Sequence, residues 1–268
     1  MKLHKYKNFE EYKQVQEEGN IKKLHCVFAN EKVIDEISKY IKWRIPNASF
    51  GICHGTRRGV EQQLFIEKTS AKVIGTEISS TATQFPNTIQ WDFHDIKKEW
   101  EGAVDFVYSN ALDHSYDPGH ALSQWIKCLN NDGLCFIEYT KYSKMSSKLD
   151  PFGANLDEVK HLIEKIGDIV DTIEVKAKTN KKRKLLYTIL VVKKRRPHYG
   201  LAPISAMKTK KFAGDNTLCQ TLREIHETTN NEEIKLKCRQ TMMMSKRLTY
   251  DAKRYKKIAK KKGLTVGD

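Results

Sequence analysis

A glycine-containing turn after the first predicted strand is the first place where this sequence could do chemistry. The turn reads GICHGTRRG, with glycines at positions 51, 55 and 59, and it leads into a predicted helix that begins near Val60. Glycine lets a ligand approach the backbone closely, and free amides at the start of a helix favour negative groups. The spacing is neither G-x-G-x-x-G nor G-x-x-x-x-G-K-[ST], so neither a dinucleotide nor a triphosphate is indicated. Such a turn can equally be a plain connection.

Carboxylates stand near the ends of the next two predicted strands. The strand KVIGTEI (72–78) ends around Glu77, and the strand NTIQWDF (87–93) ends around Asp92. A carboxylate in the first position can accept both hydroxyls of a ribose. In the second position the carboxylate, or an adjacent amide, could bind an adenine amino group. The two residues predict a nucleoside site at one edge of the sheet.

A polar segment follows the fourth predicted strand, VDFVYS (104–109). It reads NALDHSYDP and brings Asn110, Asp113 and His114 to the same edge of the sheet. Oxygen and nitrogen side chains are concentrated here, but their spacing alone does not make them converge on one ion, so we expect no metal site.

The elements that position these residues alternate between strand and helix. Strand-like runs occur at 48–53, 72–78, 87–93, 104–109 and 133–139, and helical patterns at 31–45, 60–70 and 120–129. This alternation predicts right-handed crossovers and a mostly parallel sheet.

The pattern changes after a predicted helix at 155–166. Two strand-like runs, 169–176 and 185–192, are separated by only eight residues, AKTNKKRK. That gap is too short for a crossover helix, so the two runs should pair antiparallel. The expected fold is α/β, with a mostly parallel seven-stranded sheet, helices on both faces, a terminal antiparallel strand pair and a basic, partly helical C-terminal extension.

Positive charge is concentrated at the C-terminal end of the sequence. The net charge of the 268 residues is +15, yet residues 1–140 carry 17 basic and 19 acidic side chains, whereas residues 193–268 carry 20 and 7. We predict a helical lead-in (1–24), a catalytic-type domain (25–192), a linker (193–215) and a basic helical extension (216–268).

The extension has two readings. It could bind phosphate, in RNA or at an anionic surface, through Lys246, Arg247, Lys253, Arg254, Lys256 and Lys257. It could also be an ordinary solvated lysine-rich helix.

Targeting and redox signals are few. No run of 18 apolar residues occurs, the first residues lack a secretory apolar region, and Glu10 and Glu11 are atypical of a mitochondrial presequence. The six cysteines are scattered without zinc-ligand spacing. We therefore expect a soluble intracellular protein, cytoplasmic by default, with free thiols.

Taken together, residues 25–192 resemble the class I S-adenosylmethionine-dependent methyltransferases. In this resemblance CHGTRRG is the loop for the methionine part, Glu77 the acid for the ribose, WDFHD the adenine-side segment, and YSNALDHSYDP the segment facing the methyl acceptor. The run GTEISSTATQFPNTIQWDFHD, with SNALDHSYDP, is similar to a little-described bacterial and viral branch of these enzymes.

The resemblance implies S-adenosylmethionine as cofactor and a set of cofactor contacts. These are Gly51, His54, Gly55, Thr56, Glu77, Ile78, Asp92, Phe93 and Asn110. It also implies that His114 is the candidate base for the acceptor, oriented by Asp113. The competing reading of His114 is a helix-capping or surface histidine.

The sequence departs from the family pattern at three points. The family usually has an acid before its glycine loop, where this chain has Phe50 or Gly51, and Arg57 stands where a glycine is common. There is no [DN]-P-P-[YFW] after the fourth strand, so enzymes that methylate the amino groups of bases or glutamine are not indicated.

Three functions follow in order of preference. The first is S-adenosylmethionine-dependent methyl transfer to an undetermined acceptor: a small molecule, a sugar or RNA. The second is an inactive methyltransferase-fold subunit that binds RNA within a large ribonucleoprotein through its basic extension. The third, an NAD-dependent dehydrogenase, is disfavoured by the loop spacing and by the terminal hairpin.

Overall fold

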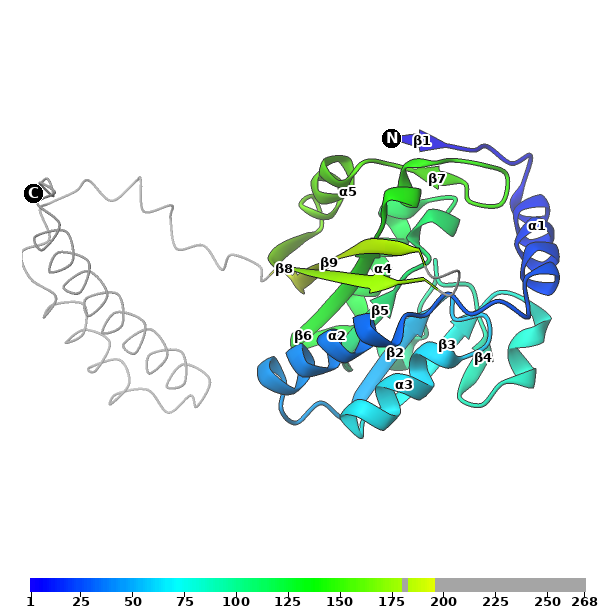
Figure 1. The fold of residues 1–268 in the computed structure, drawn as a ribbon. Helices are drawn as coiled ribbons and strands as arrows, with labels where there is room; N and C mark the ends of the chain where they lie inside the picture. Colours follow the sequence, from blue (N-terminus) through cyan, green and yellow to red (C-terminus); the bar gives the residue numbers. More distant parts are fainter. Residues whose placement is uncertain (180–182, 196–268) are drawn as a thin grey trace, which may run out of the picture. The chain divides into compact units, whose positions relative to one another are not determined.

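A seven-stranded sheet forms the centre of the part of the chain that the structure describes, residues 1–179 and 183–195 of a computed structural model (Figure 1). The strands follow the order β4-β3-β2-β5-β6-β9-β8 across the sheet. Their bounds are β2 (Phe50–His54), β3 (Lys72–Glu77), β4 (Thr88–Gln90), β5 (Val104–Ser109), β6 (Leu129–Tyr139), β8 (Gly167–Lys178) and β9 (Lys184–Lys194). Neighbouring strands are parallel except where β9 pairs with β6 and β8. The predicted sheet, with its final antiparallel pair, is confirmed.

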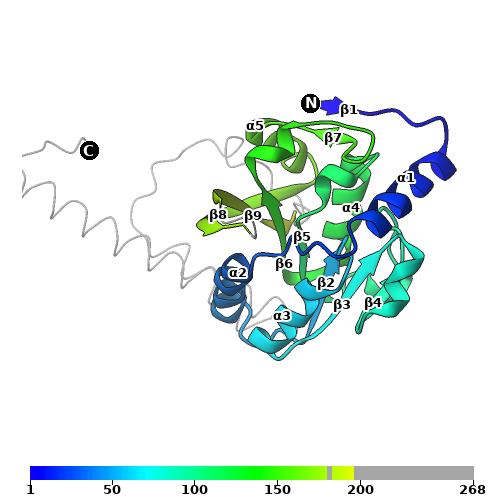
Figure 2. The ribbon, with the colours of Figure 1, turned by 45° about the vertical axis from the view of Figure 1, so that its right-hand side comes forward.

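Helices cover both faces of this sheet (Figures 1 and 2). The helices are α1 (Phe9–Lys22), α2 (Glu31–Arg44), α3 (Val60–Thr69), α4 (Pro118–Cys128) and α5 (Leu156–Ile163). The apolar side chains of α2 and α3 pack on one face, in a cluster with Phe106 and Phe136, and those of α4 and α5 pack on the other, around Trp125. The spacing of Val33, Ile34, Ile37 and Ile41 along α2 predicts this burial, and all four are fully buried.

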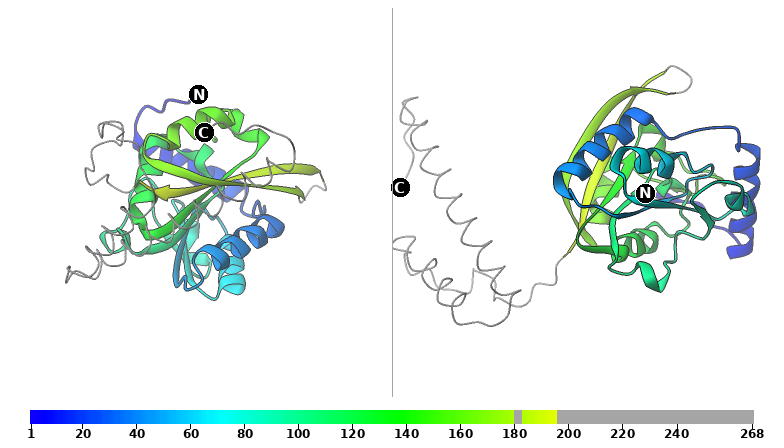
Figure 3. Two further views of the ribbon diagram at one scale, coloured as in Figure 1. Left: turned by 90° about the vertical axis from the view of Figure 1, so that its left-hand side faces the viewer. Right: turned by 90° about the horizontal axis from the view of Figure 1, so that it is seen from below.

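Two short strands, β1 (Lys2–Leu3) and β7 (Phe152–Gly153), lie outside the main sheet. They pair antiparallel with each other. Along one edge of the main sheet runs the β8–β9 hairpin (Figure 3). Among the described residues, no helix is long and apolar enough to cross a membrane.

The register of the parallel strands brings their carboxyl ends together. His54 of β2 is aligned with Thr76 of β3 and with Ser109 of β5, and Ser109 is aligned with Ile137 of β6. The segments that follow these strands therefore meet at one edge of the sheet, where the sequence places the candidate site residues.

The structure differs from the sequence-based prediction at the end of β4, among other element bounds. β4 ends at Gln90 rather than near Phe93, because the chain turns there: the Trp91 indole donates to the Asp95 carbonyl at 2.9 Å, and the His94 amide donates to Asp92 Oδ1 at 3.0 Å. Asn30 occupies the N-cap of α2, but its side chain makes no capping hydrogen bond and instead donates to the Lys178 carbonyl at 3.0 Å. The predicted linker and basic extension lie, from residue 196 onward, outside the described residues.

Candidate active site

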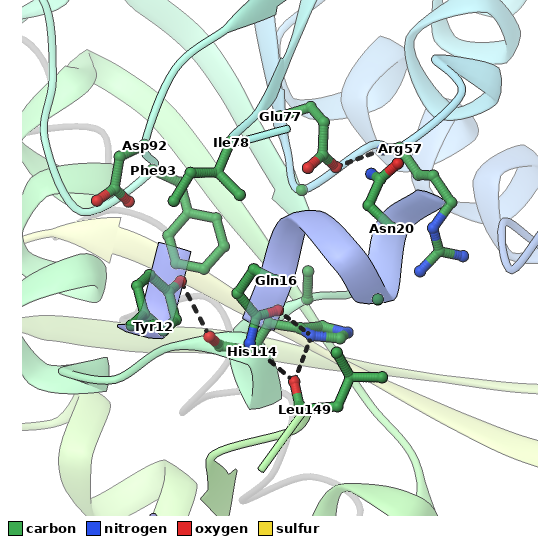
Figure 4. Close-up of a pocket in the computed structure, with 13 residues that line it drawn as sticks. Tyr12, Gln16, Asn20, Arg57, Glu77, Ile78, Asp92, Phe93, His114 and Leu149 are labelled. Atoms are coloured by element: carbon green, nitrogen blue, oxygen red, sulfur yellow. Dashed lines mark hydrogen bonds between the residues drawn. The ribbon is translucent and has the colours of Figure 1, made fainter. Parts of the chain in front are cut away.

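A small cavity of about 50 Å³ lies at the carboxyl ends of the central strands, beneath α1 (Figure 4). Its walls come from α1 and from the loops after β2, β3, β4 and β5. The lining residues are Tyr12, Gln16, Gly19, Asn20, Gly55, Arg57, Glu77, Ile78, Asp92, Phe93, Ala111, His114 and Leu149. Five of the predicted cofactor contacts and the candidate base are among them.

Glu77 is fixed in the small cavity by backbone donors. The carboxylate is 8% exposed; Oε2 accepts from the Arg57 amide at 3.1 Å and Oε1 from the Ser79 amide at 3.0 Å. Each oxygen keeps acceptor capacity. The carboxylate is therefore held in one orientation and can accept two further hydrogen bonds, as from vicinal hydroxyls.

Asp92 and Phe93 form a second, equally fixed wall. Asp92 Oδ1 accepts from the His94 amide and contacts His94 Nδ1 at 2.7 Å, while His94 Nε2 lies 2.7 Å from Ser115 Oγ. Phe93 is 8% exposed, and its carbonyl accepts from the Trp125 indole at 2.9 Å. This wall combines a flat apolar ring with a carboxylate that has a free oxygen.

The glycine loop approaches the cavity with its backbone. Gly55 has a φ of +74°, and a Cβ there would lie 2.5 Å from the Ala111 Cβ. Glycine is thus required at this position for both conformation and space. The amides of Gly55 and Thr56 donate to the Thr76 carbonyl, and that of Arg57 to Glu77. A ligand can therefore approach the loop backbone closely. The sequence suggested that free amides here would bind an anion, but these three amides already have acceptors.

Helix α1 closes the small cavity with polar side chains. The Tyr12 hydroxyl donates to the His114 carbonyl at 3.2 Å, Gln16 Nε2 donates to the Leu149 carbonyl at 3.0 Å, and Thr81 Oγ1 donates to Asn20 Oδ1 at 2.9 Å. Its buried positions, Tyr12, Gln16, Gly19 and Asn20, share one helical face. Sequence reasoning missed these residues because that face is polar and gives no apolar periodicity.

His114 reaches into the small cavity with a defined ring orientation. Nδ1 lies 3.0 Å from both Gln16 Oε1 and the Leu149 carbonyl, and Nε2 lies 3.6 Å from Asp150 Oδ1. Because both neighbours of Nδ1 are acceptors, the proton is assigned to Nδ1, and Nε2 is the nitrogen that can take a proton. Gln16 and Leu149, rather than Asp113, orient the ring.

A large cavity of about 890 Å³ adjoins the small one. Gly55, Arg57, Ala111 and His114 line both cavities. The predicted contacts Thr56 and Asn110, and also Asp113, line the large cavity and not the small one, together with residues 23 and 25–30, Tyr142 and Tyr187. The two cavities thus meet at the glycine loop and at the candidate base.

Three carboxyl groups face the large cavity: Glu61 is buried, and Glu138 and Asp113 are partly buried. Burial raises the pKa of Glu61 and of Glu138 to about 7, and it raises the pKa of Asp113 as well. The Tyr108 hydroxyl donates to Glu138 Oε2 at 2.8 Å. Glu61 and Glu138 were missed by sequence reasoning because they lie inside a helix and a strand rather than in a motif.

Two predicted cofactor contacts do not line either cavity. Gly51 lies in β2 against the Phe106 ring, with a Cβ position only 2.3 Å from that ring. His54 is fully buried and stacks on Trp125, with ring centroids 5.2 Å apart and Nδ1 2.9 Å from Thr76 Oγ1. Both positions belong to the core and lie outside the two cavities, where a cofactor contact was predicted.

The remaining candidates concern metal, thiol and nucleic-acid chemistry. Within residues 1–179 and 183–195, no three His, Cys, Asp or Glu side chains are grouped to hold a metal ion. Cys53, Cys128 and Cys135 are buried, and burial raises the pKa of each thiol. The tail residues from Lys246 to Lys257 lie outside the described part of the chain.

The fold is shared with a solved methyltransferase. The structure of Burkholderia thailandensis 1,6-didemethyltoxoflavin-N1-methyltransferase, with bound 1,6-didemethyltoxoflavin and S-adenosylhomocysteine, matches with a TM-score of 0.56 and 16% sequence identity, over 72% of this chain and 93% of that one. This chain has the class I S-adenosylmethionine-dependent methyltransferase fold. The strand order, with one antiparallel strand inserted next to the edge, agrees with that assignment.

Other similarities to known methyltransferases are weaker. A TehB-like S-adenosylmethionine-dependent methyltransferase from Corynebacterium glutamicum gives a TM-score of 0.44 at 16% identity, over 59% of this chain and 86% of that one. A methyltransferase from Archaeoglobus fulgidus gives 0.46 at 12% identity, over 62% and 95%. No family model and no curated protein matches the sequence.

Proposed function

We propose that this protein is an S-adenosylmethionine-dependent methyltransferase that acts on a small-molecule acceptor. One observation carries the proposal: a cavity walled by Glu77, Asp92 and Phe93 meets, at Gly55, a larger cavity that contains His114. The small cavity suits the nucleoside end of a ligand, and the larger cavity suits its reacting end.

The side chains of the small cavity suit an adenosine group by their chemistry. Glu77 would accept the two ribose hydroxyls, the free oxygen of Asp92 would accept the adenine amino group, and Phe93 with Ile78 would flank the base. At about 50 Å³ the cavity is too small for a nucleoside while α1 lies over it, so binding requires α1 to move or its side chains to withdraw.

The chain's contribution to catalysis would be alignment and removal of a proton. When bound, the cofactor supplies an electrophilic methyl group on a sulfonium for in-line displacement, which depends mainly on correct positioning. His114 Nε2 would accept the acceptor's proton, and Asp150 Oδ1, 3.6 Å away, would stabilise the resulting imidazolium. Gln16 and the Leu149 carbonyl keep Nδ1 protonated and the ring in place.

The size of the large cavity supports a small acceptor. Its volume of about 890 Å³ must hold the amino-acid part of the cofactor as well as the acceptor, and it falls within the range of small-molecule sites. The inactive RNA-binding alternative depends on residues outside the described ones and is not favoured. The resemblance to a bacterial and viral branch rests on sequence alone and stays a prediction.

Calorimetric titration with S-adenosylhomocysteine tests the proposal. We expect the wild-type protein to bind, and Glu77→Ala to bind at least about 30-fold more weakly because a buried charge-assisted acceptor is lost. Glu67→Ala, which changes an exposed glutamate of α3, is the matched control and should bind as the wild type does. Failure of the wild-type protein to bind would refute the proposal.

A transfer assay then separates the acceptor classes. Protein incubated with methyl-labelled S-adenosylmethionine and fractionated cell extract should label the small-molecule fraction, and His114→Ala should reduce that labelling. Label found only in RNA would refute the small-molecule acceptor while leaving the methyltransferase assignment intact.

A further inference from the structure

Glu61 is a buried carboxylate in the wall of the large cavity that forms no close ion pair in the described part of the chain; Arg57 interacts with it electrostatically from a greater distance. It lies in the first turn of α3, and its side chain is 6% exposed. Among residues 1–179 and 183–195, no lysine, arginine or histidine forms an ion pair with it within 4.0 Å. Asn110 provides a side-chain hydrogen bond, which does not neutralise the charge. A carboxylate kept in such a place suits a cationic ligand group.

Arg57, in the loop before α3, is the complementary basic side chain. Its backbone is left-handed, with φ of 45°, at a position where glycine would be unstrained. The guanidinium lies 4.8 Å from the Phe28 ring centroid, and Nε is buried without a hydrogen-bond partner. Arg57 lines both cavities, so the unused donor lies where they meet.

The strand before the loop cannot supply the acidic partner. At Gly51 a side chain would have its Cβ 2.3 to 2.7 Å from three atoms of the Phe106 ring. An acidic side chain reaches this part of the sheet from α3 instead: the Glu61 carboxyl interacts electrostatically with Cys53 of β2 and with Tyr108 of β5.

We propose that Glu61 and Arg57 hold the amino-acid end of the cofactor, Glu61 binding its ammonium group and Arg57 its carboxylate. This inference rests on the proposed function, since it needs the adenosine end to lie beside Glu77. From there a ligand that passes Gly55 enters the large cavity, whose lining includes both side chains. The pKa of Glu61, raised by burial to about 7 in the free protein, is consistent with a carboxyl group that a bound cation would stabilise in its charged form.

Two ligands that differ only in the amino-acid end separate this inference from the proposed function. S-adenosylhomocysteine carries the ammonium and the carboxylate, whereas 5′-methylthioadenosine carries neither and keeps the nucleoside. Calorimetry with the full-length protein should show that Glu61→Gln and Arg57→Gln each lower the affinity for S-adenosylhomocysteine about 10- to 100-fold. The affinity for 5′-methylthioadenosine should stay within about twofold of the wild-type value. Retained binding of 5′-methylthioadenosine also shows that each variant is folded.

Matched controls are available at exposed positions. Glu67→Gln on the exposed face of α3, and Arg44→Gln at the exposed end of α2, should bind both ligands as the wild type does. Unchanged S-adenosylhomocysteine affinity in Glu61→Gln or Arg57→Gln would overturn the inference, and so would equal weakening of both ligands. If the wild-type protein binds neither ligand, the proposed function fails as well.

Discussion

Gln16 and His114 are 98 residues apart in the sequence and are joined by a 3.0 Å hydrogen bond between Nδ1 and Oε1. The same glutamine donates from Nε2 to the Leu149 carbonyl, which itself accepts from His114. The candidate base is thus tied to the helix that covers the small cavity. A movement of α1 that takes Gln16 away from the ring would leave the Leu149 carbonyl as the partner that orients the imidazole.

Gln16→Ala should loosen α1. The change removes hydrogen bonds to His114 and Leu149 worth about 1 to 2 kcal/mol together, so amide exchange in residues 9–22 should become about 5- to 30-fold faster. Hydrogen exchange followed by mass spectrometry measures this. Gln14→Ala is the control, because Gln14 is exposed and its side chain donates to Glu18 on the same helix. Equal exchange in both variants would mean that Gln16 does not hold α1.

Gly51→Ala should destabilise the domain by about 1 to 3 kcal/mol through overpacking against Phe106. Urea denaturation measures the change in the free energy of unfolding. Gly119→Ala, where the nearest atoms to a new Cβ lie 3.7 Å away, should be close to neutral. A Gly51→Ala protein as stable as the wild type would show that the core has room for a methyl group beside Phe106 and would contradict this prediction.

Glu61→Gln should alter how stability depends on pH. The folded chain keeps a proton on Glu61 up to about pH 7, whereas the unfolded chain releases it near pH 4.5. The native state therefore binds more protons between these values, and the wild-type free energy of unfolding loses about 2 kcal/mol through this group from pH 5 to pH 8. Urea titrations at both pH values should show that loss removed in Glu61→Gln and kept in Glu67→Gln.

The pKa shift of His54 affects stability in the opposite direction, because it lowers the free energy of unfolding at acidic pH. Burial lowers its pKa from 6.5 to about 3, so the folded chain holds the neutral imidazole while the unfolded chain binds a proton below pH 6.5. This contribution is present above pH 6.5 and is lost as the pH falls toward 3, by about 2 kcal/mol between pH 7 and pH 5. His54→Phe, which keeps a ring against Trp125, should remove the loss.

The same urea titrations check the assignment to His54. His161→Gln, an exposed histidine of α5, should keep the wild-type difference between pH 7 and pH 5. A His54→Phe protein with that difference unchanged would place the acid sensitivity in another residue.

The sheet could be predicted from the sequence because its strands carry strong local signals. The run 104–109 is observed as β5 without any change of bounds, and the eight-residue gap before 185–192 gave the antiparallel pairing correctly. The predicted strand boundary was wrong where a side chain bonds the local backbone. At Asp92 the carboxylate accepts from the His94 amide, and β4 ends early, at Gln90.

The site was only partly predictable, because much of it depends on tertiary contacts. Glu77, Asp92 and Asn110 follow strands whose ends align, so their common placement follows from topology. Gln16 could not be foreseen, since its partners His114 and Leu149 are more than 90 residues away. His54 and Gly51 look like loop residues in sequence, but strand alternation and the Phe106 and Trp125 rings take them into the core.

The place of β9 in the sheet affects the order in which the domain can be completed during synthesis. β9 is the last strand in the described part of the sequence, yet it lies between β6 and β8 and contains six consecutive buried residues, 187–192. Until residue 194 has left the ribosome, β6 and β8 cannot be joined, and β6 presents an unpaired apolar edge. A chain stalled a few residues earlier would have every motif of the candidate site and still lack a closed core.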